Sequence, residues 1–318
     1  MILFESAVPK TPAALDRVFA EARGRGARVV FPEGEAPVIQ EAAAYLAAEG
    51  LANPVLIGGE APGCETVLVE ELSVDRELNH MLMAKRSKLT EGAAQRLLTR
   101  SGYLAGAMVA AKRADAMIAG AVTPTKRVIE AASLTVGLAE GVKTPSSFFL
   151  LGVPGRPLIF ADCGFNVSPT AEQLADIAVA SARSGAALLG EARTAFLSFS
   201  TLGSGAGPEV DRVIEALCLA RAKAPDLSID GEFQADTALN AAIAAKKGAG
   251  GAVAGQANVL IFPNLEAGNI AYKLVQELAG AQAIGPILQG FARPVADLSR
   301  GATVQDVVAV TVLTLALG

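Results

Sequence analysis

The sequence of 318 residues contains no tryptophan, one histidine and only three cysteines. Cys64, Cys163 and Cys218 are odd in number and far apart, which excludes a disulfide framework and a cysteine-based metal site and favours a reducing, cytoplasmic environment. The single histidine, His80, lies between apolar residues in NHMLMA, and we expect it to pack in the core. Because a nucleophilic thiol needs a base, covalent catalysis by Cys163 is disfavoured.

Long apolar runs and an excess of basic residues are also missing. The N-terminal stretch MILFESAVPKTPAALDR lacks the basic start and apolar run of a signal peptide, so the chain is expected to be mature as written. The most apolar segment, Val307 to Leu317, is shorter than the roughly 18 residues that span a bilayer, and it predicts a buried terminal helix. A net charge of -5 gives no general attraction for nucleic acid or membranes, so an anionic ligand needs a local basic pocket.

What the sequence does contain is a 52% hydrophobic composition with 32 glycines, which is typical of helices packed on a sheet. Short apolar runs alternate with longer amphipathic ones, and this pattern predicts an α/β fold in which helices cover a parallel sheet. The elements predicted in the first part of the chain are strand 28–34, helix 36–50, strand 54–59, helix 103–114, strand 115–122 and helix 125–138.

A second series of elements starts at residue 143, so the pattern predicts a domain boundary near Gly141 to Lys143. Its first two strands, 146–153 and 156–162, are close together in the chain and are predicted to be antiparallel or adjacent. The later predicted elements are helix 171–190, strand 194–201, helix 210–224, strand 228–233, helix 235–248, strand 259–263, helix 267–280, strand 283–290 and a final helix.

A glycine-rich loop follows the predicted strand 194–201 and enters a helix through Pro208. Such a loop can offer backbone N–H groups to a phosphate, although it has neither the Walker pattern nor GxGxxG, and an ordinary strand-to-helix turn is the alternative. The candidate phosphate-binding residues are Ser200, Thr201, Gly203, Ser204 and Gly205.

Polar residues also follow other predicted strands, where side chains often face a ligand. Carboxylates in such places can bind a metal or transfer protons, and the alternatives are helix caps and turns. The residues in question are Asp162, Cys163 and Asn166, then Asp230, Glu232, Gln234 and Asp236, then Asn264 and Asn269. Basic residues concentrate between 85 and 127, and this region holds the best candidates for binding phosphates.

The segment PVADLSRGATVQDVV places Ser299 and Arg300 directly before the apolar terminal segment. Thr303 and Asp306 have the spacing of a capping box, which predicts that the last helix begins here. By itself, this pattern assigns Asp306 a structural role.

Motifs along most of the chain resemble those of the phosphate acetyltransferase family, and the likeness is dense from about Ser146 onward. The matching stretches are PEG (32–34), ADC with PTAEQLADIA (161–178), LSFSTLGSG (197–205), PDLSIDGEFQADTAL (225–239), ANVLIFPNLEAGNIAYKLVQ (257–276), AIGPILQG (283–290) and DLSRGATVQDVV. The resemblance implies two α/β domains facing each other across a cleft, as in isocitrate and isopropylmalate dehydrogenases. It places domain I at 1–142 plus 297–318, domain II at 143–296 and the active site in the cleft between them.

The same resemblance implies transfer of an acetyl group between acetyl phosphate and coenzyme A in a ternary complex, by a homodimer that needs no metal or redox cofactor. The family's catalytic serine, arginine and aspartate fall on Ser299, Arg300 and Asp306. Asp306 then takes the thiol proton, Arg300 holds the phosphate and Ser299 stabilises charge on the carbonyl oxygen. An ordinary aspartate is a weaker base than a thiolate by about 4.6 pKa units, so the active site must desolvate it or couple proton transfer to attack.

The first third of the chain departs from the family pattern. Glu130 occupies a position where an arginine commonly helps to bind CoA, and Val38 stands where another arginine is frequent. Lys126 and Arg127, one turn before Glu130, are the expected substitutes, and Arg86 and Asn264 complete the predicted substrate-binding residues. The departures leave two alternatives open, a paralogue acting on propionyl or butyryl phosphate and a non-catalytic module that binds acyl-CoA.

Overall fold

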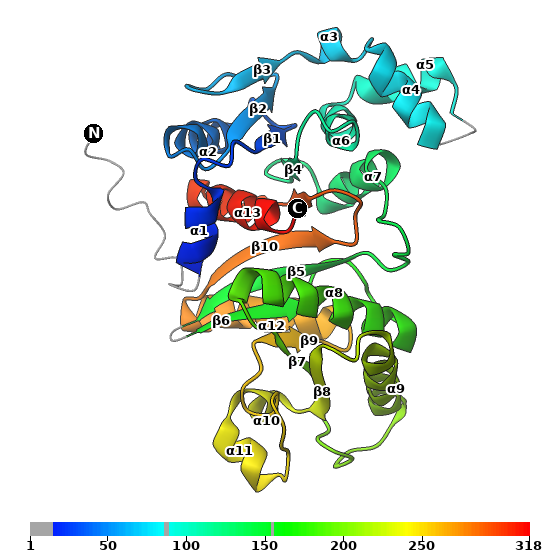
Figure 1. The fold of residues 1–318 in the computed structure, drawn as a ribbon, viewed down its shortest axis with the longest axis vertical. Helices are drawn as coiled ribbons and strands as arrows, with labels where there is room; N and C mark the ends of the chain where they lie inside the picture. Colours follow the sequence, from blue (N-terminus) through cyan, green and yellow to red (C-terminus); the bar gives the residue numbers. More distant parts are fainter. Residues whose placement is uncertain (1–14, 86–88, 154–155) are drawn as a thin grey trace. The chain divides into compact units, whose positions relative to one another are not determined.

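The computed structural model describes residues 15–85, 89–153 and 156–318 (Figure 1). The chain forms two compact units. Unit 1 contains the described residues up to Gly141 together with Phe291–Gly318, and unit 2 contains Val142–Gly290. The chain therefore leaves unit 1, forms unit 2 and returns to unit 1 at residue 291. The resemblance predicts this second boundary six residues later, at residue 297.

The described residues of unit 1 form five strands in the order β3-β2-β1-β4-β11, and every neighbouring pair is parallel. The strands are β1 (Arg28–Phe31), β2 (Asn53–Ile57), β3 (Glu65–Val67), β4 (Ala116–Ala119) and β11 (Val295–Asp297). The central strands β1 and β4 are almost continuously apolar and buried, as expected for a parallel sheet that is covered on both faces.

The described helices of unit 1 begin with α1 (Asp16–Ala22), α2 (Pro37–Ala48), α3 (Val69–Leu72) and α4 (Arg76–Lys85), and continue with α5 (Glu91–Leu98), α6 (Ser101–Ala110), α7 (Thr125–Thr135) and α13 (Val304–Ala316). Helices α2, α6, α7 and α13 lie within or next to predicted ranges, whereas α3, α4 and α5 fall where the sequence pattern indicated no element. His80 is exposed on α4, while its neighbours Leu78 and Leu82 are buried. The predicted packing role of His80 was therefore wrong, because a residue midway between i and i+4 points to the opposite side of a helix.

In the part of unit 2 that the structure describes, six strands follow the order β10-β5-β6-β9-β7-β8. They are β5 (Ser146–Val153), β6 (Arg156–Ala161), β7 (Arg193–Leu197), β8 (Ser228–Phe233), β9 (Val259–Ile261) and β10 (Gln282–Gln289). Strand β5 is antiparallel to β6 and to β10, whereas β6, β9, β7 and β8 pair in parallel. The pair that was predicted to be antiparallel or adjacent is thus both.

The helices of unit 2 are α8 (Ala171–Leu189), α9 (Pro208–Lys223), α10 (Ala235–Leu239), α11 (Ala241–Lys246) and α12 (Leu265–Ala279). The sequence predicted one helix over 235–248, but the structure divides it at Asn240 into α10 and α11. Asn240 has an extended conformation, and its side chain accepts hydrogen bonds from Ala242 N and Ile243 N. An asparagine favours the N-cap position of a helix. Its side-chain hydrogen bonds therefore start a new helix here, although the apolar periodicity of the sequence continues across Asn240.

Both units have apolar cores. In unit 1, α13 is buried from Val307 to Leu315, and the hydroxyls of Thr311 and Thr314 donate to backbone carbonyls one turn earlier. The predicted buried terminal helix is therefore confirmed. In unit 2, Phe149 stacks on Tyr272 with ring centroids 4.1 Å apart. Among the described residues, no helix is both long and apolar enough to cross a membrane.

Candidate active site

The candidate catalytic residues lie on one segment of unit 1, between the end of β11 and the first turn of α13. Ser299 and Arg300 are exposed in the turn, which is closed by a hydrogen bond of 2.9 Å from Ala302 N to the carbonyl of Ser299. Asp306 is half-buried in the first turn of the helix. The fold thus presents a hydroxyl, a guanidinium and a carboxylate on a short segment after the carboxyl end of a parallel strand, where ligands of α/β proteins commonly bind.

Asp306 also forms the predicted capping box. Its Oδ2 accepts hydrogen bonds from Thr303 N at 2.9 Å and from Thr303 Oγ1 at 2.8 Å, while Asp306 N donates to Thr303 Oγ1 at 3.2 Å. The capping interpretation is therefore confirmed for this conformation. A proton taken by Asp306 must go to Oδ1 or displace the donors on Oδ2.

The PEG turn after β1 holds the chain that follows β4, the strand that pairs with β11. Glu33 Oε2 accepts from the amides of Gly120 and Ala121 at 3.0 and 2.8 Å, and its Oε1 accepts from those of Val122 and Thr123 at 3.2 and 2.6 Å. An ionised carboxylate has acceptor sites for all four donors. Glu33 thereby fixes the chain that leaves β4, a role that short-range sequence patterns did not indicate.

Asp297, the last residue of β11, is the second acid that the sequence did not single out. It is fully buried, and within the described part of the chain neither of its carboxyl oxygens has a hydrogen-bond partner. The pKa of Asp297 is raised to about 7; burial is the main cause, the Thr125 hydroxyl opposes it, the nearby Glu33 charge adds to it, and the Leu298 amide opposes it. Glu33 therefore accepts four hydrogen bonds, whereas the Thr125 hydroxyl and the Leu298 amide lie near Asp297 without reaching hydrogen-bond geometry to either of its oxygens.

The glycine-rich loop of unit 2 is closed by its own hydrogen bonds. Glu232, which is buried, accepts from Ser200 Oγ at 2.8 Å and from Gly203 N at 2.9 Å. The remaining amide donors of residues 200–205 bond to Ser198 Oγ (from Ser200), Ser204 Oγ (from Thr201), Glu232 O (from Leu202), Thr201 O (from Ser204) and Ser200 Oγ (from Gly205). All six amides have internal acceptors, so an incoming phosphate would have to compete for them.

The polar residues after β6 and β9 also have internal partners. Asp162 accepts from Ser147 Oγ at 2.5 Å, from three backbone amides and from Asn166 Nδ2. Cys163 is fully buried, and desolvation, with a contribution from Asp162, raises its thiol pKa well above the usual value. Asn264 caps α12 by accepting from Ala267 N at 2.9 Å. These contacts are those of structural residues, and a buried thiol with a raised pKa is a poor nucleophile.

The two aspartates of the DGEFQAD stretch form ion pairs, in contrast to the buried Glu232 between them. Asp230 pairs with Arg221 at 2.5 Å and Asp236 with Lys247 at 2.9 Å. In the described residues, no group of three or more histidine, cysteine, aspartate or glutamate side chains is arranged to hold a metal ion.

The predicted CoA-binding cations lie at the start of α7. Lys126 and Arg127 are exposed, and Arg127 pairs with Glu130 at 2.9 Å. Glu130, the residue that departs from the family pattern, thus offsets part of the positive charge next to it. Arg86 lies outside the described residues.

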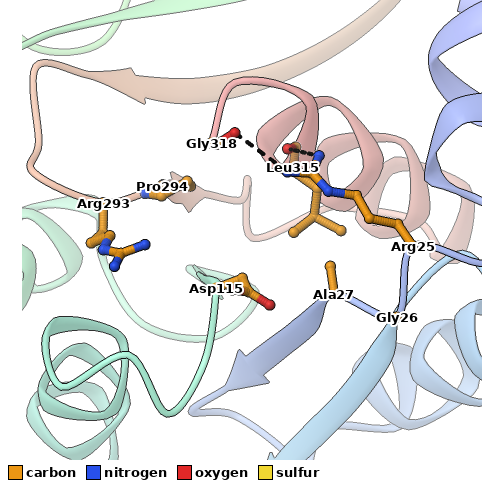
Figure 2. A pocket seen from close by; sticks show the side chains of 8 residues that line it. All are labelled: Arg25, Gly26, Ala27, Asp115, Arg293, Pro294, Leu315 and Gly318. Carbon is orange, nitrogen blue, oxygen red and sulfur yellow. Dashed lines mark hydrogen bonds between the residues drawn. The ribbon is translucent and has the colours of Figure 1, made fainter.

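A cavity of about 270 Å³ lies elsewhere in unit 1 (Figure 2). Ala27, Asp115 and Pro294 line it, and each directly precedes a strand, so the cavity is at the amino ends of β1, β4 and β11. Arg25 donates across it to Leu315 O at 3.0 Å. Ser299 follows the carboxyl end of β11, so the cavity and the candidate site lie at opposite ends of the strands of the same parallel sheet.

Comparison with known proteins identifies the family. The chain matches the phosphate acetyl/butaryl transferase family over residues 13–315. It belongs to this family. A phosphate acetyltransferase of Paracoccus denitrificans is 42% identical over 312 residues, which cover 94% of this chain and 98% of that protein. A phosphotransacetylase structure from Streptococcus pyogenes matches with a TM-score of 0.89 at 35% identity and covers 96% of this chain and 97% of that one.

The family match confirms the prediction made from the motifs, and it makes the protein an acyltransferase. The fold prediction is confirmed as well. The structure of 4-hydroxythreonine-4-phosphate dehydrogenase from Klebsiella pneumoniae, 14% identical, matches with a TM-score of 0.53 over 92% of this chain and 99% of that one. This more distant likeness shows that the chain has an isocitrate dehydrogenase-like α/β fold.

Proposed function

We propose that this protein is a phosphate acetyltransferase that interconverts acetyl phosphate and CoA with acetyl-CoA and phosphate. The observation that carries the proposal is the β11–α13 segment, where Ser299 and Arg300 are exposed and the Asp306 carboxylate follows in the first helical turn. Its support outside the structure is the 42% identity to the phosphate acetyltransferase of Paracoccus denitrificans.

The chemistry that we assign to this segment is direct attack of the CoA sulfur on the acetyl carbonyl carbon. The thiol proton passes to Asp306, the S–C bond forms, and the C–O bond to phosphate breaks as the tetrahedral state collapses. Ser299 donates a hydrogen bond to the carbonyl oxygen as it gains charge, and Arg300 holds the departing phosphate with its planar pair of N–H groups. Because Thr303 occupies Asp306 Oδ2, we propose that CoA binding loosens the capping box or that the proton goes to Oδ1.

Two structural facts support a mechanism without a covalent enzyme intermediate. Cys163 is fully buried among apolar residues, and its raised thiol pKa disfavours the nucleophilic thiolate. His80, the only histidine of the sequence, is exposed on α4, whereas Cys163 is fully buried.

We also propose that Lys126 and Arg127 bind a phosphate of CoA. Both are exposed at the start of α7, and lysine and arginine are the usual partners of such groups. The ion pair with Glu130 offsets part of the positive charge of Arg127, so we expect weaker binding of CoA than an unpaired arginine would give. The contributions of Arg86, Asn264, the 200–205 loop and the inter-domain cleft stay predictions.

The proposed oligomer is a homodimer, and we assign α12 to its interface. Ile270, Leu274 and Leu278 recur every four residues on one face of this helix and are 57%, 51% and 83% exposed. An apolar stripe of this kind is costly in water and suits a self-complementary contact. Leu274→Glu should give a monomer by light scattering, whereas Val74→Glu, an exposed apolar site in unit 1, should not change the mass. An unchanged mass for Leu274→Glu excludes α12 from the interface.

The reaction is tested by following thioester formation from CoA with acetyl, propionyl and butyryl phosphate. The proposal expects the highest kcat/KM for acetyl phosphate, and at least about a 100-fold loss of turnover in Arg300→Ala and in Asp306→Asn. Arg293→Ala is the matched control, because this arginine lines the cavity at the opposite end of the strands.

Each result other than the expected one points to a different function or removes one residue assignment. A preference for a longer acyl phosphate identifies a paralogue of different specificity. Binding of acetyl-CoA without turnover by the unmodified protein identifies a non-catalytic module, and full turnover in Asp306→Asn removes the base assignment.

A further inference from the structure

Asp297 occupies a special position relative to the candidate catalytic segment. It ends β11 two residues before Ser299, and the amide of Leu298 donates to Ala119 O at 2.7 Å. The chain between Asp297 and Ser299 is therefore tied to the end of β4. A change in the charge of Asp297 acts at the point where the segment leaves the sheet.

The protein makes room for this carboxyl by having a glycine opposite. Gly120 has φ of +108°, and a Cβ on it would lie only 2.2 Å from Asp297 Oδ1. The carboxyl therefore packs against bare backbone, in a space that other residues would fill. Burial of an unpaired carboxylate in such a place is costly, so the neutral, protonated acid is the form that suits it.

Within the described residues, no cation pairs with the Asp297 carboxyl. The turn after β1 contributes Glu33, whose carboxylate is already held by four amides. Strand β4, Ala116–Ala119, carries no ionisable side chain. Helices α7 and α13 pack on β11 and contribute the Thr125 hydroxyl, the exposed Lys126 and Arg127, Glu130 in its pair with Arg127, and Asp306 in its cap.

Neighbouring acids with such different surroundings commonly divide their protonation states between them. Glu33 accepts from four backbone amides, while neither oxygen of Asp297 has a partner in hydrogen-bond geometry. The pKa of Asp297, raised by burial to about 7, puts its ionisation in the range in which an enzyme works. Ionisation would place a second negative charge next to Glu33, in a region of low dielectric constant where like charges repel strongly.

We propose that Asp297 is a positioning residue that must hold a proton for the Ser299–Arg300 segment to bind an acyl phosphate. The inference rests on the proposed function and adds to it a condition on substrate binding. With Asp297 neutral, the end of β11 stays against β4 and no second negative charge is added to that of Glu33 near the site of the anionic substrate. With Asp297 ionised, the apparent affinity falls in proportion to the protonated fraction that is left.

The first test compares pH profiles of the full-length protein and Asp297→Asn, which keeps the shape of the side chain and removes its charge. Between about pH 6 and pH 9, the KM for acetyl phosphate should rise on the order of 100-fold more in the unmodified protein than in the variant, with kcat at saturation within about threefold. Ionisation of CoA and of acetyl phosphate affects both proteins equally, so the ratio of the two profiles isolates Asp297. Asp115→Asn, an exposed carboxylate at the amino end of β4, should follow the unmodified protein.

A ratio that stays flat with pH overturns the proposal, as does a change in kcat alone. If the unmodified protein forms no acetyl-CoA at all, the proposed function fails, and the second test still examines Asp297. That test also applies if Asp297→Asn does not fold.

The second test uses sulfate as an anion that does not titrate in this range. Calorimetry of the unmodified protein near pH 8, in two buffers of different ionisation enthalpy, should show uptake of close to one proton for each sulfate bound, with binding lost in Arg300→Ala. Sulfate binding without proton uptake, or no sulfate binding at either pH 6 or pH 8, overturns the proposal.

Discussion

Substitution of Asp297 by asparagine should change how the stability of the protein depends on pH. The unfolded chain exposes this acid to water, where its pKa is 3.8, whereas the folded protein raises the pKa to about 7. A carboxyl whose pKa is raised on folding binds its proton more tightly in the native state. Stability is therefore lost as the pH rises from about 4 to about 7, and the full loss persists above pH 7.

The size of this effect follows from the shift. A difference of about three pKa units corresponds to about 4 kcal/mol, because each unit is worth about 1.4 kcal/mol. Asparagine carries no charge at any pH and does not have this loss. The free energy of unfolding of Asp297→Asn, minus that of the unmodified protein, should thus increase by about 4 kcal/mol between about pH 4 and pH 8.

Urea unfolding at a series of pH values measures this difference, and the contributions of all groups that do not interact with Asp297 cancel in it. The exposed Asp115→Asn should show a difference that changes by less than about 1 kcal/mol over the same range. If the difference for Asp297→Asn is equally constant, Asp297 is hydrated or paired in solution, and the argument from its burial is wrong.

Three further substitutions test single contacts. Thr303→Ala should cost about 1 kcal/mol of stability through the lost helix cap, but it should leave turnover unchanged or higher. Unfolding experiments measure the first effect and enzyme kinetics the second. A loss of turnover means that the cap holds Asp306 in its working position. Glu33→Gln should cost on the order of 3 kcal/mol, because the amide group turns a donor toward the four N–H groups of residues 120–123, and an unchanged unfolding midpoint would contradict this assignment. Cys163→Ala should keep turnover within about threefold in folded protein, and its loss would reinstate a role for the thiol.

The sequence predicted well those features that depend on neighbouring residues. Apolar runs located the described strands other than β3 and β11, the close spacing of 146–153 and 156–162 indicated an antiparallel or adjacent pair, and Thr303 with Asp306 marked the start of the last helix. Each of these signals lies within a few residues, and local physics is enough to interpret it.

The features that the sequence did not reveal depend on residues far apart in the chain. Glu33 accepts from amides 87 to 90 positions away, and Glu232 closes a loop around 30 residues earlier in the sequence. Asp297 looks like any polar residue next to a turn until the fold places Gly120 against it. Motif resemblance located the candidate catalytic set, but it gave no indication of which acids the fold would bury.

The division of unit 1 between two separate stretches of chain has a consequence for biosynthesis. Strand β11 completes the sheet by pairing with β4, yet it emerges from the ribosome only after the whole of unit 2. Until then, the edge of β4 has no partner from β11 within its own unit, and such an edge is open to unwanted pairing with other chains. Ser299, Arg300 and Asp306 all arrive with this same late segment. A polypeptide released before residue 291 would hold the complete chain of unit 2 and every other strand of unit 1 without any of the groups proposed to catalyse the reaction.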